Sequence, residues 1–207
     1  MDARSTWVGI DVGGRRKGFH LAAVRGDGRV QLSHADGPDA VETAVGRTLE
    51  ALPVRVAVDA PAAWAPDGVP ARPDEVAFLA ARVCAIRFTP DAATAAARTD
   101  GYYEWVEHGL QLWHGLREAD LEVVECFPTA SWTRWLGPRE QRTRPAWTGA
   151  GIASLYAVGD GGVLFGDRPR NQDQRDALAA ALTARQSAHP DTVRFGPLVV
   201  PPPGPAW

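Results

Sequence analysis

Short apolar runs alternate with amphipathic segments along this chain. The runs 7–12 and 19–24 are rich in β-forming residues and are joined by a glycine-containing turn, and a second glycine turn at 26–28 leads into 29–34. Runs of this kind separated by short glycine turns are typical of antiparallel hairpins. This part of the chain therefore predicts a meander of three strands.

Two later runs, 54–60 and 121–127, are almost continuously apolar. Strands that are buried on both faces and lie parallel to their neighbours have this composition. With the meander they predict an α/β protein whose mixed sheet has five strands. Further elements are expected as helices over 38–51, 74–85, 100–118, 128–136, near 150–158 and over 171–186, a loop over 137–149, and a last short strand over 193–200.

The length of 207 residues is enough for one domain with a full core. We expect a single domain over residues 1–200, with an irregular, partly helical insertion around 62–120 and a proline-rich tail over 201–207. No apolar run reaches the roughly 18–20 residues that span a bilayer, so no membrane partner is expected. The N-terminus also lacks the basic and apolar segments of an export signal.

Cysteine content and net charge bear on the cellular location of the protein and on its possible contacts with nucleic acid. Cys84 and Cys126 are too few for a disulfide framework, which favours a reducing, cytoplasmic location. The net charge of −3 and the pI of about 5.9 indicate no broad basic surface. Any contact with nucleic acid would therefore be local, and the sequence leaves protein partners unknown.

Three of the apolar runs carry an acid at their far end. Asp11, Asp59 and Glu125 are each followed within three residues by glycine or proline. Ligands of α/β sheets gather at the carboxyl ends of parallel strands, so the three carboxylates would converge if their strands are adjacent and parallel. Each also has a structural explanation: Asp11 as a turn residue, Asp59 as a cap, and Glu125 as the partner of an arginine.

The helix expected over 171–186 offers further acids. Asp173 and Asp176 are three residues apart and share one face of this helix, and Ala180 and Thr183 continue the same stripe. These small residues would let the helix backbone approach the sheet closely. Asp173 has the simpler interpretation of a favourable acid in the first helical turn.

Carboxylates that crowd together repel one another unless a cation joins them. Oxygen-rich sites suit Mg²⁺ or Mn²⁺, and two such ions can activate water and stabilise the leaving oxygen in phosphodiester cleavage. The pattern therefore predicts a divalent-metal-dependent nuclease. The predicted metal ligands are Asp11, Asp59, Asp173 and Asp176, and the predicted catalytic set is Asp11, Asp59, Glu125 and Asp176.

The segments "GIDVGGRRKGFHLAAV", "VAVDAP", "VVECFP" and "DQRDALAAALTA" occur in this order along the chain. In these segments, and over most of its length, the sequence resembles the domain of unknown function 429 family, whose members are predicted nucleases. The resemblance implies a ribonuclease H-like fold, with helices on both faces of the sheet. It also implies that Asp11, Asp59, Glu125 and Asp176 are the acids of the site.

Two groups of basic residues are candidates for contacts with a nucleic-acid backbone. They are Arg15, Arg16 and Lys17 in the turn after Asp11, and Arg142 and Arg144 in the expected loop 137–149. The second group lies near Trp132, Trp135 and Trp147, and arginines with aromatic rings suit single strands. Tryptophans at helical spacing are more often core residues, however, and a solvated hairpin tip is the more common explanation of a basic turn.

Two other functions remain open from the sequence. The same fold could bind a nucleotide or a phosphate compound without cutting it, and the acidic pI favours this alternative. The chain could also be an inactive scaffold that acts through the aromatic residues of 100–150.

Overall fold

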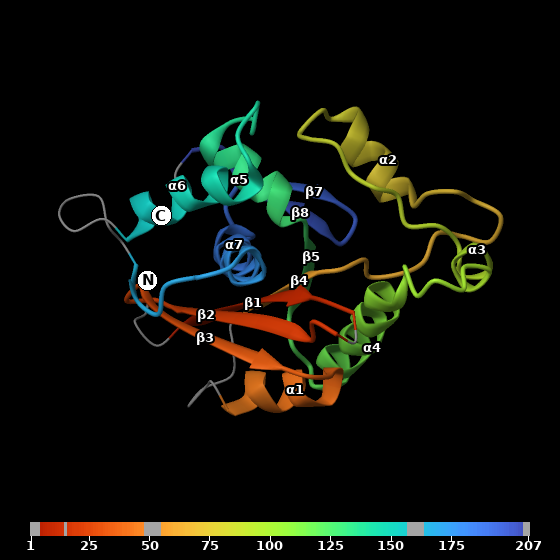
Figure 1. The fold of residues 1–207 in the computed structure, drawn as a ribbon, viewed down its shortest axis with the longest axis horizontal. Coiled ribbons are helices and arrows are strands. Elements are labelled where there is room, and N and C mark those ends of the chain that lie inside the picture. The colour runs from red at the N-terminus through yellow and green to blue at the C-terminus, as the bar shows by residue number, and fades with distance from the viewer. Residues whose placement is uncertain (1–4, 15, 48–54, 157–163, 205–207) are drawn as a thin grey trace.

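The strands of this protein form one mixed sheet (Figure 1). The computed structural model describes residues 5–14, 16–47, 55–156 and 164–204, and in these residues the sheet has eight strands in the order β6-β3-β2-β1-β4-β5-β8-β7. The mixed α/β sheet is confirmed, but the expected number of five strands was wrong. The central strands are β1 (Thr6–Val12), β2 (Phe19–Arg25), β3 (Arg29–Ala35), β4 (Arg55–Asp59) and β5 (Val123–Cys126).

The predicted meander and the parallel strands are both present. β2 pairs antiparallel with β1 and β3, whereas β4 runs parallel to β1 and β5 runs parallel to β4. The carboxyl ends of β1, β4 and β5 therefore lie next to one another at one edge of the sheet. This is the arrangement that a convergence of strand-end acids requires.

Three short strands extend the sheet beyond the prediction. β6 (Phe165–Gly166) pairs with β3 and is too short to produce an apolar run. The strand expected over 193–200 is a hairpin of β7 (Val193–Phe195) and β8 (Leu198–Val200). Gly196 has a φ of 56°, which glycine adopts readily, and it turns the chain between the two strands.

Most predicted helices are present, with changed ends. α6 begins inside the expected loop 137–149, because Thr143 caps it by accepting a hydrogen bond from the Ala146 amide. The predicted positions 48–51, 54, 157–158 and 205–207 lie outside the described residues. The helices are α1 (Pro38–Arg47), α2 (Pro73–Ala80), α3 (Ala92–Ala96), α4 (Glu104–Glu118), α5 (Pro128–Leu136), α6 (Arg144–Leu155) and α7 (Gln172–Gln186).

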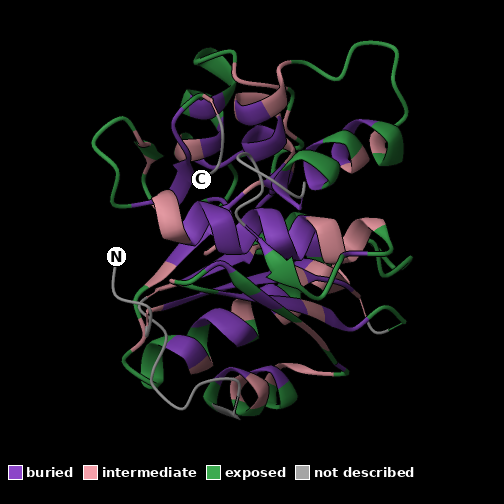
Figure 2. Cartoon of the chain, turned by 90° about the vertical axis from the view of Figure 1, so that its left-hand side faces the viewer, coloured by how far each residue is buried: buried purple, intermediate pink, exposed green. Residues whose placement is uncertain are grey.

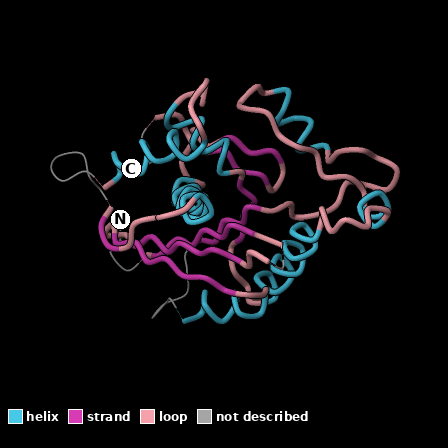
Figure 3. Tube along the Cα trace, in the orientation of Figure 1, coloured by secondary structure: helices cyan, strands magenta, loops and turns pink. Residues whose placement is uncertain are grey.

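Helices cover both faces of the sheet, as expected. α7 lies against one face with α5 and α6 behind it, and α1 and α4 lie against the other face (Figures 1 and 3). Val8 and Ile10 of β1 pack towards α1 and α4, whereas Trp7 packs with residues of α7. None of the described helices combines the length and the apolar content needed to cross a bilayer.

The middle of α7 is the most deeply buried helical segment (Figure 2). Every residue from Asp176 to Ala184 is buried. At Gly9 the helix backbone lies directly on β1: a Cβ atom built there would stand 2.0 Å from the Ala181 nitrogen and 2.1 Å from the Ala177 oxygen. Only glycine fits this contact, which confirms the close approach that the small residues of α7 predicted.

We expect Gly9→Ala to lower the free energy of unfolding by at least about 3 kcal/mol, because the added methyl group meets backbone atoms that cannot rotate away. Gly149→Ala is the matched control, since its Cβ would meet nothing within 4 Å and alanine favours a helix by about 0.5–1 kcal/mol. Urea unfolding of both variants measures the difference. Equal stability of the two variants would contradict the tight contact.

Candidate active site

Asp11 and Asp59 are direct neighbours at the ends of β1 and β4. The parallel register pairs Gly9 with Ala57 and Asp11 with Asp59. Because side chains alternate along a strand, Asp11 faces the same side as Gly9, which is the side covered by α7. Asp59 faces that side with Ala57, which packs in the same cluster as residues of α7. The two strand-end aspartates therefore point to the same face.

α7 brings two more acids to this place. Asp176 is only 3% exposed, and its carboxylate accepts hydrogen bonds from Arg144 Nη2 and Gln172 Nε2, each at 2.9 Å. Asp173 lies one turn earlier and forms an ion pair of 3.1 Å with Lys17 Nζ. Four aspartates that are far apart in the sequence thus lie in one electrostatic group, with one cation on each helix acid.

Burial and crowding raise the pKa values of Asp11, Asp59 and Asp176. Burial, followed by repulsion from Asp176 and Asp173, raises the pKa of Asp11 to about 8. Burial and the neighbouring charge of Asp11 raise the pKa of Asp59 well above its ordinary value. Burial also raises the pKa of Asp176 to about 6, although Arg144 and Gln172 oppose this shift. The arrangement therefore disfavours full ionisation without an added cation.

The two strand-end carboxylates differ from the two helix acids in their described partners. Neither Asp11 nor Asp59 accepts a hydrogen bond from a residue that the structure describes. His20 Nδ1 lies 4.0 Å from Asp11 Oδ2, and burial lowers the pKa of His20, which favours its neutral form. Across the described ranges, no three His, Cys, Asp or Glu side chains stand in a geometry that could hold a metal ion.

The Glu125 side chain lies on the opposite face of the sheet from this group. The register pairs Val58 with Glu125 and Ala57 with Val124, so Glu125 faces the side of Val58, opposite to Asp11. Both of its carboxylate oxygens accept hydrogen bonds from Arg72, at 2.7 and 2.8 Å. Its surroundings therefore match the structural explanation offered by the sequence, in which Glu125 is the partner of an arginine.

Arg72 and Glu125 belong to a buried polar network. Arg72 is 3% exposed and also lies 3.4 Å from Glu75, while Glu75 accepts hydrogen bonds from the amide and hydroxyl groups of Thr89. The amide of Ala62 donates to Glu125 at 2.9 Å. This network fastens the segment after β4 to β5. Sequence analysis missed Arg72. Pro73 directly after it and Glu75 three residues later are signals of a helix start that could have pointed to it.

The basic candidates differ in position. Arg144 contacts Asp176 and Lys17 contacts Asp173, so both lie at the acid group. Arg16 is exposed, whereas Arg142 donates to the carbonyl oxygens of its own loop. Arg15 lies outside the described residues. The nearby tryptophans are core residues and are not available to stack on bases, namely Trp132, Trp135 and Trp147.

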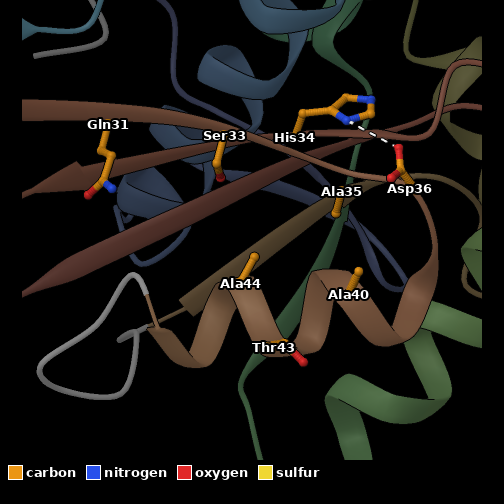
Figure 4. A pocket seen from close by; sticks show the side chains of 8 residues that line it. All are labelled: Gln31, Ser33, His34, Ala35, Asp36, Ala40, Thr43 and Ala44. Carbon is orange, nitrogen blue, oxygen red and sulfur yellow. Dashed lines mark ion pairs between the residues drawn. The ribbon is translucent and has the colours of Figure 1, made fainter.

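A shallow pocket of about 490 Å³ lies between β3 and α1 (Figure 4). Gln31, Ser33 and Thr43 supply its polar lining. Because Ser33 and Ala35 face α1 while Asp11 faces α7, this pocket and the acid group open on opposite faces of the sheet. We take the acid group as the candidate active site because its crowded carboxylates have strongly raised pKa values.

Comparison with known proteins gives two solved structures of related shape. One is that of Thermus thermophilus RuvC, with 18% identity and a TM-score of 0.44, covering 85% of this chain and 90% of RuvC. The other is T. thermophilus RuvC in complex with a Holliday junction substrate, with 16% identity and a TM-score of 0.42, covering 86% of this chain and 90% of RuvC. Among curated proteins, none matches the chain.

A family model matches almost the whole chain. Residues 9–199 match the family described as protein of unknown function (DUF429). The chain therefore belongs to this family, which confirms the resemblance seen in its motifs.

Breaking the buried pair should be costly. We expect Glu125→Gln to lower the free energy of unfolding by about 3–5 kcal/mol, because it leaves the Arg72 charge buried without its counter-ion. Asp100→Asn breaks the solvent-exposed pair with Arg98 and should change the stability far less, because water screens exposed ion pairs. Urea unfolding measures both. If Glu125→Gln is as stable as the control, the network does not hold this segment.

The raised pKa values predict stability that falls with rising pH in metal-free protein. Folded Asp11, with its pKa of about 8, keeps a proton that the unfolded chain has already released above its ordinary pKa of 3.8. The folded state therefore loses stability as pH rises towards about 8. Asp11→Asn should flatten this dependence and raise the free energy of unfolding at pH 8 by about 2 kcal/mol or more.

Urea unfolding with EDTA across this pH range tests the prediction. Asp67→Asn is the control, because Asp67 is exposed and lies outside the acid group. A wild-type protein that gains stability between about pH 5 and 8, or a control that flattens the profile as strongly as Asp11→Asn, would contradict the prediction.

Proposed function

We propose that this protein is a divalent-metal-dependent nuclease of ribonuclease H-like fold, which hydrolyses phosphodiester bonds in nucleic acid. The observation that supports this proposal is the meeting of Asp11, Asp59, Asp173 and Asp176 on the α7 face of the sheet. The meander followed by parallel strands is the sheet that this fold class led us to expect. The two free cysteines, half-buried Cys84 and buried Cys126, suit a reducing cytoplasm.

The donor chemistry of the site suits a hard divalent cation, although the described carboxylates would have to move closer together to coordinate one. Carboxylate oxygens are the donors that Mg²⁺ and Mn²⁺ prefer, and the mutual repulsion of Asp11, Asp59 and Asp176 is what such an ion would relieve. Asp11 and Asp59 would hold the metal, with Asp176 and Asp173 completing its surroundings. When bound, the metal would supply activation of a water molecule and neutralisation of the charge that develops on the phosphate.

The cations of the chain have a separate task in this proposal. Arg144 neutralises Asp176 and Lys17 neutralises Asp173 in the structure. Both side chains are partly exposed, at 37% and 65%, so they can exchange a carboxylate for a phosphate oxygen when substrate arrives. We expect local contacts with the nucleic-acid backbone from Arg144 and Lys17, with Arg16 and Arg142 as further candidates, and Arg15 stays a candidate from the sequence alone.

Glu125 has a positioning role in this proposal. Its carboxylate is occupied by Arg72 and faces away from Asp11. It acts on the site through the segment after β4, because the Ala62 amide that it holds lies three residues after Asp59. Loss of Glu125 would therefore disturb Asp59 through the backbone.

A non-catalytic binding module for a nucleotide or another phosphate compound is the second candidate. The net charge of −3 favours it, because a nuclease for long substrates usually carries a broad basic surface. Such a module would bind phosphate ligands at the same acid group through a metal. It differs from the nuclease only in leaving the phosphodiester bond intact.

A cleavage screen tests the proposed activity. Labelled single strands, duplexes, RNA–DNA hybrids and four-way junctions are incubated with the protein and Mn²⁺ or Mg²⁺. We expect cleavage of at least one substrate, loss of cleavage with EDTA, and a loss of at least about 100-fold in Asp11→Asn and Asp59→Asn. Asp67→Asn, an exposed carboxylate outside the site, should cleave like wild type.

Three results would overturn the nuclease. Cleavage by Asp11→Asn at the wild-type rate would identify a contaminating enzyme. Metal-dependent binding of substrates without cleavage would favour the binding module. Failure of the wild type to bind Mn²⁺ at millimolar concentration would leave neither of these two functions with a metal site.

A further inference from the structure

A row of four polar side chains crosses the sheet beneath the start of α7. The strand registers pair Asp59 with Asp11, Asp11 with His20, and His20 with His34. Paired residues face the same side of a sheet, and Ala22 and Val24 of β2 pack on the α7 side, two and four residues after His20. Two imidazoles therefore continue the line of the two strand-end aspartates.

His20 has an unused nitrogen directed at the acid group. Its Nδ1 is 4.0 Å from Asp11 Oδ2, and the side chain is 13% exposed. This nitrogen is inaccessible to solvent and has no hydrogen-bond partner among the described residues. Buried polar atoms without a partner are uncommon in folded proteins, and a bound ion or water is one of the ordinary explanations.

The distance between the two atoms allows one ion to contact both. Bonds from Mg²⁺ or Zn²⁺ to oxygen and to imidazole nitrogen are about 2.1 Å long, so two such bonds span up to roughly 4 Å. The 4.0 Å between His20 Nδ1 and Asp11 Oδ2 lies at this limit, and a small rotation of either side chain shortens it.

His34 is not in the same situation. Its Nε2 donates a hydrogen bond to the Lys17 carbonyl oxygen at 2.8 Å, and its Nδ1 lies 3.7 Å from Asp36 (Figure 4). Its ring packs edge-on against His20, with 4.9 Å between the ring centres. Both nitrogens of His34 have partners, and its ring supports the orientation of His20.

We propose that His20 is a ligand, through Nδ1, of the metal ion that Asp11 holds. This inference rests on the proposed metal site and adds a nitrogen donor to an otherwise all-oxygen set. Imidazole suits first-row transition metals, whereas all-oxygen sets suit Mg²⁺. The site therefore prefers Mn²⁺ to Mg²⁺, and His20 is the residue that sets this preference.

The experiment reads metal coordination directly in the full chain loaded with Mn²⁺. Pulsed electron paramagnetic resonance detects a ¹⁴N nucleus bound to Mn²⁺, and calorimetry gives the affinities for Mn²⁺ and Mg²⁺. The test variant is His20→Phe, which keeps a ring without a ligating nitrogen, and His34→Phe is the matched control one strand further along the row. Circular dichroism and urea unfolding check that each variant folds.

We expect the ¹⁴N signal in wild type and in His34→Phe, and its loss in His20→Phe. The affinity of His20→Phe for Mn²⁺ should fall by roughly 10–100-fold, with a smaller change for Mg²⁺. If His20→Phe binds no Mn²⁺, His20→Gln repeats the measurement with a polar side chain of similar length. Asp11→Asn should weaken the binding of both metals.

Several outcomes would overturn the inference. Wild type that binds Mn²⁺ in an Asp11-dependent manner without a ¹⁴N signal would remove His20 as a ligand and leave the proposed metal site intact. A signal that survives in a folded His20→Phe or His20→Gln variant would have the same effect. No Mn²⁺ binding by wild type would remove the proposed function itself, together with this inference.

Discussion

The contact between the α7 backbone and β1 at Gly9 is the constraint on which the site depends. A Cβ atom at Gly9 would stand 2.0 Å from a backbone nitrogen of α7, so the helix lies as close to the sheet as a helix can. Alanines occupy the helix positions around this contact, and their small side chains let the α7 backbone lie close to the sheet. Because α7 begins beyond the ends of β1 and β4, its first turns bring Asp173 and Asp176 over the strand-end aspartates.

This close packing creates an electrostatic conflict. Burial and mutual repulsion raise the pKa values of Asp11, Asp59 and Asp176 together, and the chain offsets only part of the conflict with Arg144 and Lys17. These two cations come from the start of α6 and from the turn after β1. Groups of this kind lower stability, and they are typical of functional sites, where local physical rules are broken.

Strand alternation separates acids that look equivalent in the sequence. Asp59 and Glu125 both end apolar runs on neighbouring parallel strands, but their positions in the register differ by one residue. Because side chains alternate between faces, Asp59 points to α7 and Glu125 points to the opposite side. There Arg72 binds both carboxylate oxygens of Glu125, and the acid becomes part of the support for the segment after β4.

The sequence by itself determined the central strands, the meander, α7 and the positions of Asp11 and Asp59 at strand ends, because apolar periodicity and glycine turns are local signals. Only the tertiary structure decided the number of strands, since β6 and the β7–β8 hairpin depend on pairing with distant segments. It also decided which face each acid occupies, that Arg72 would meet Glu125, and that His20 would lie beside Asp11. Strand register and contacts between distant segments determine these features, and local patterns in the sequence do not reveal them.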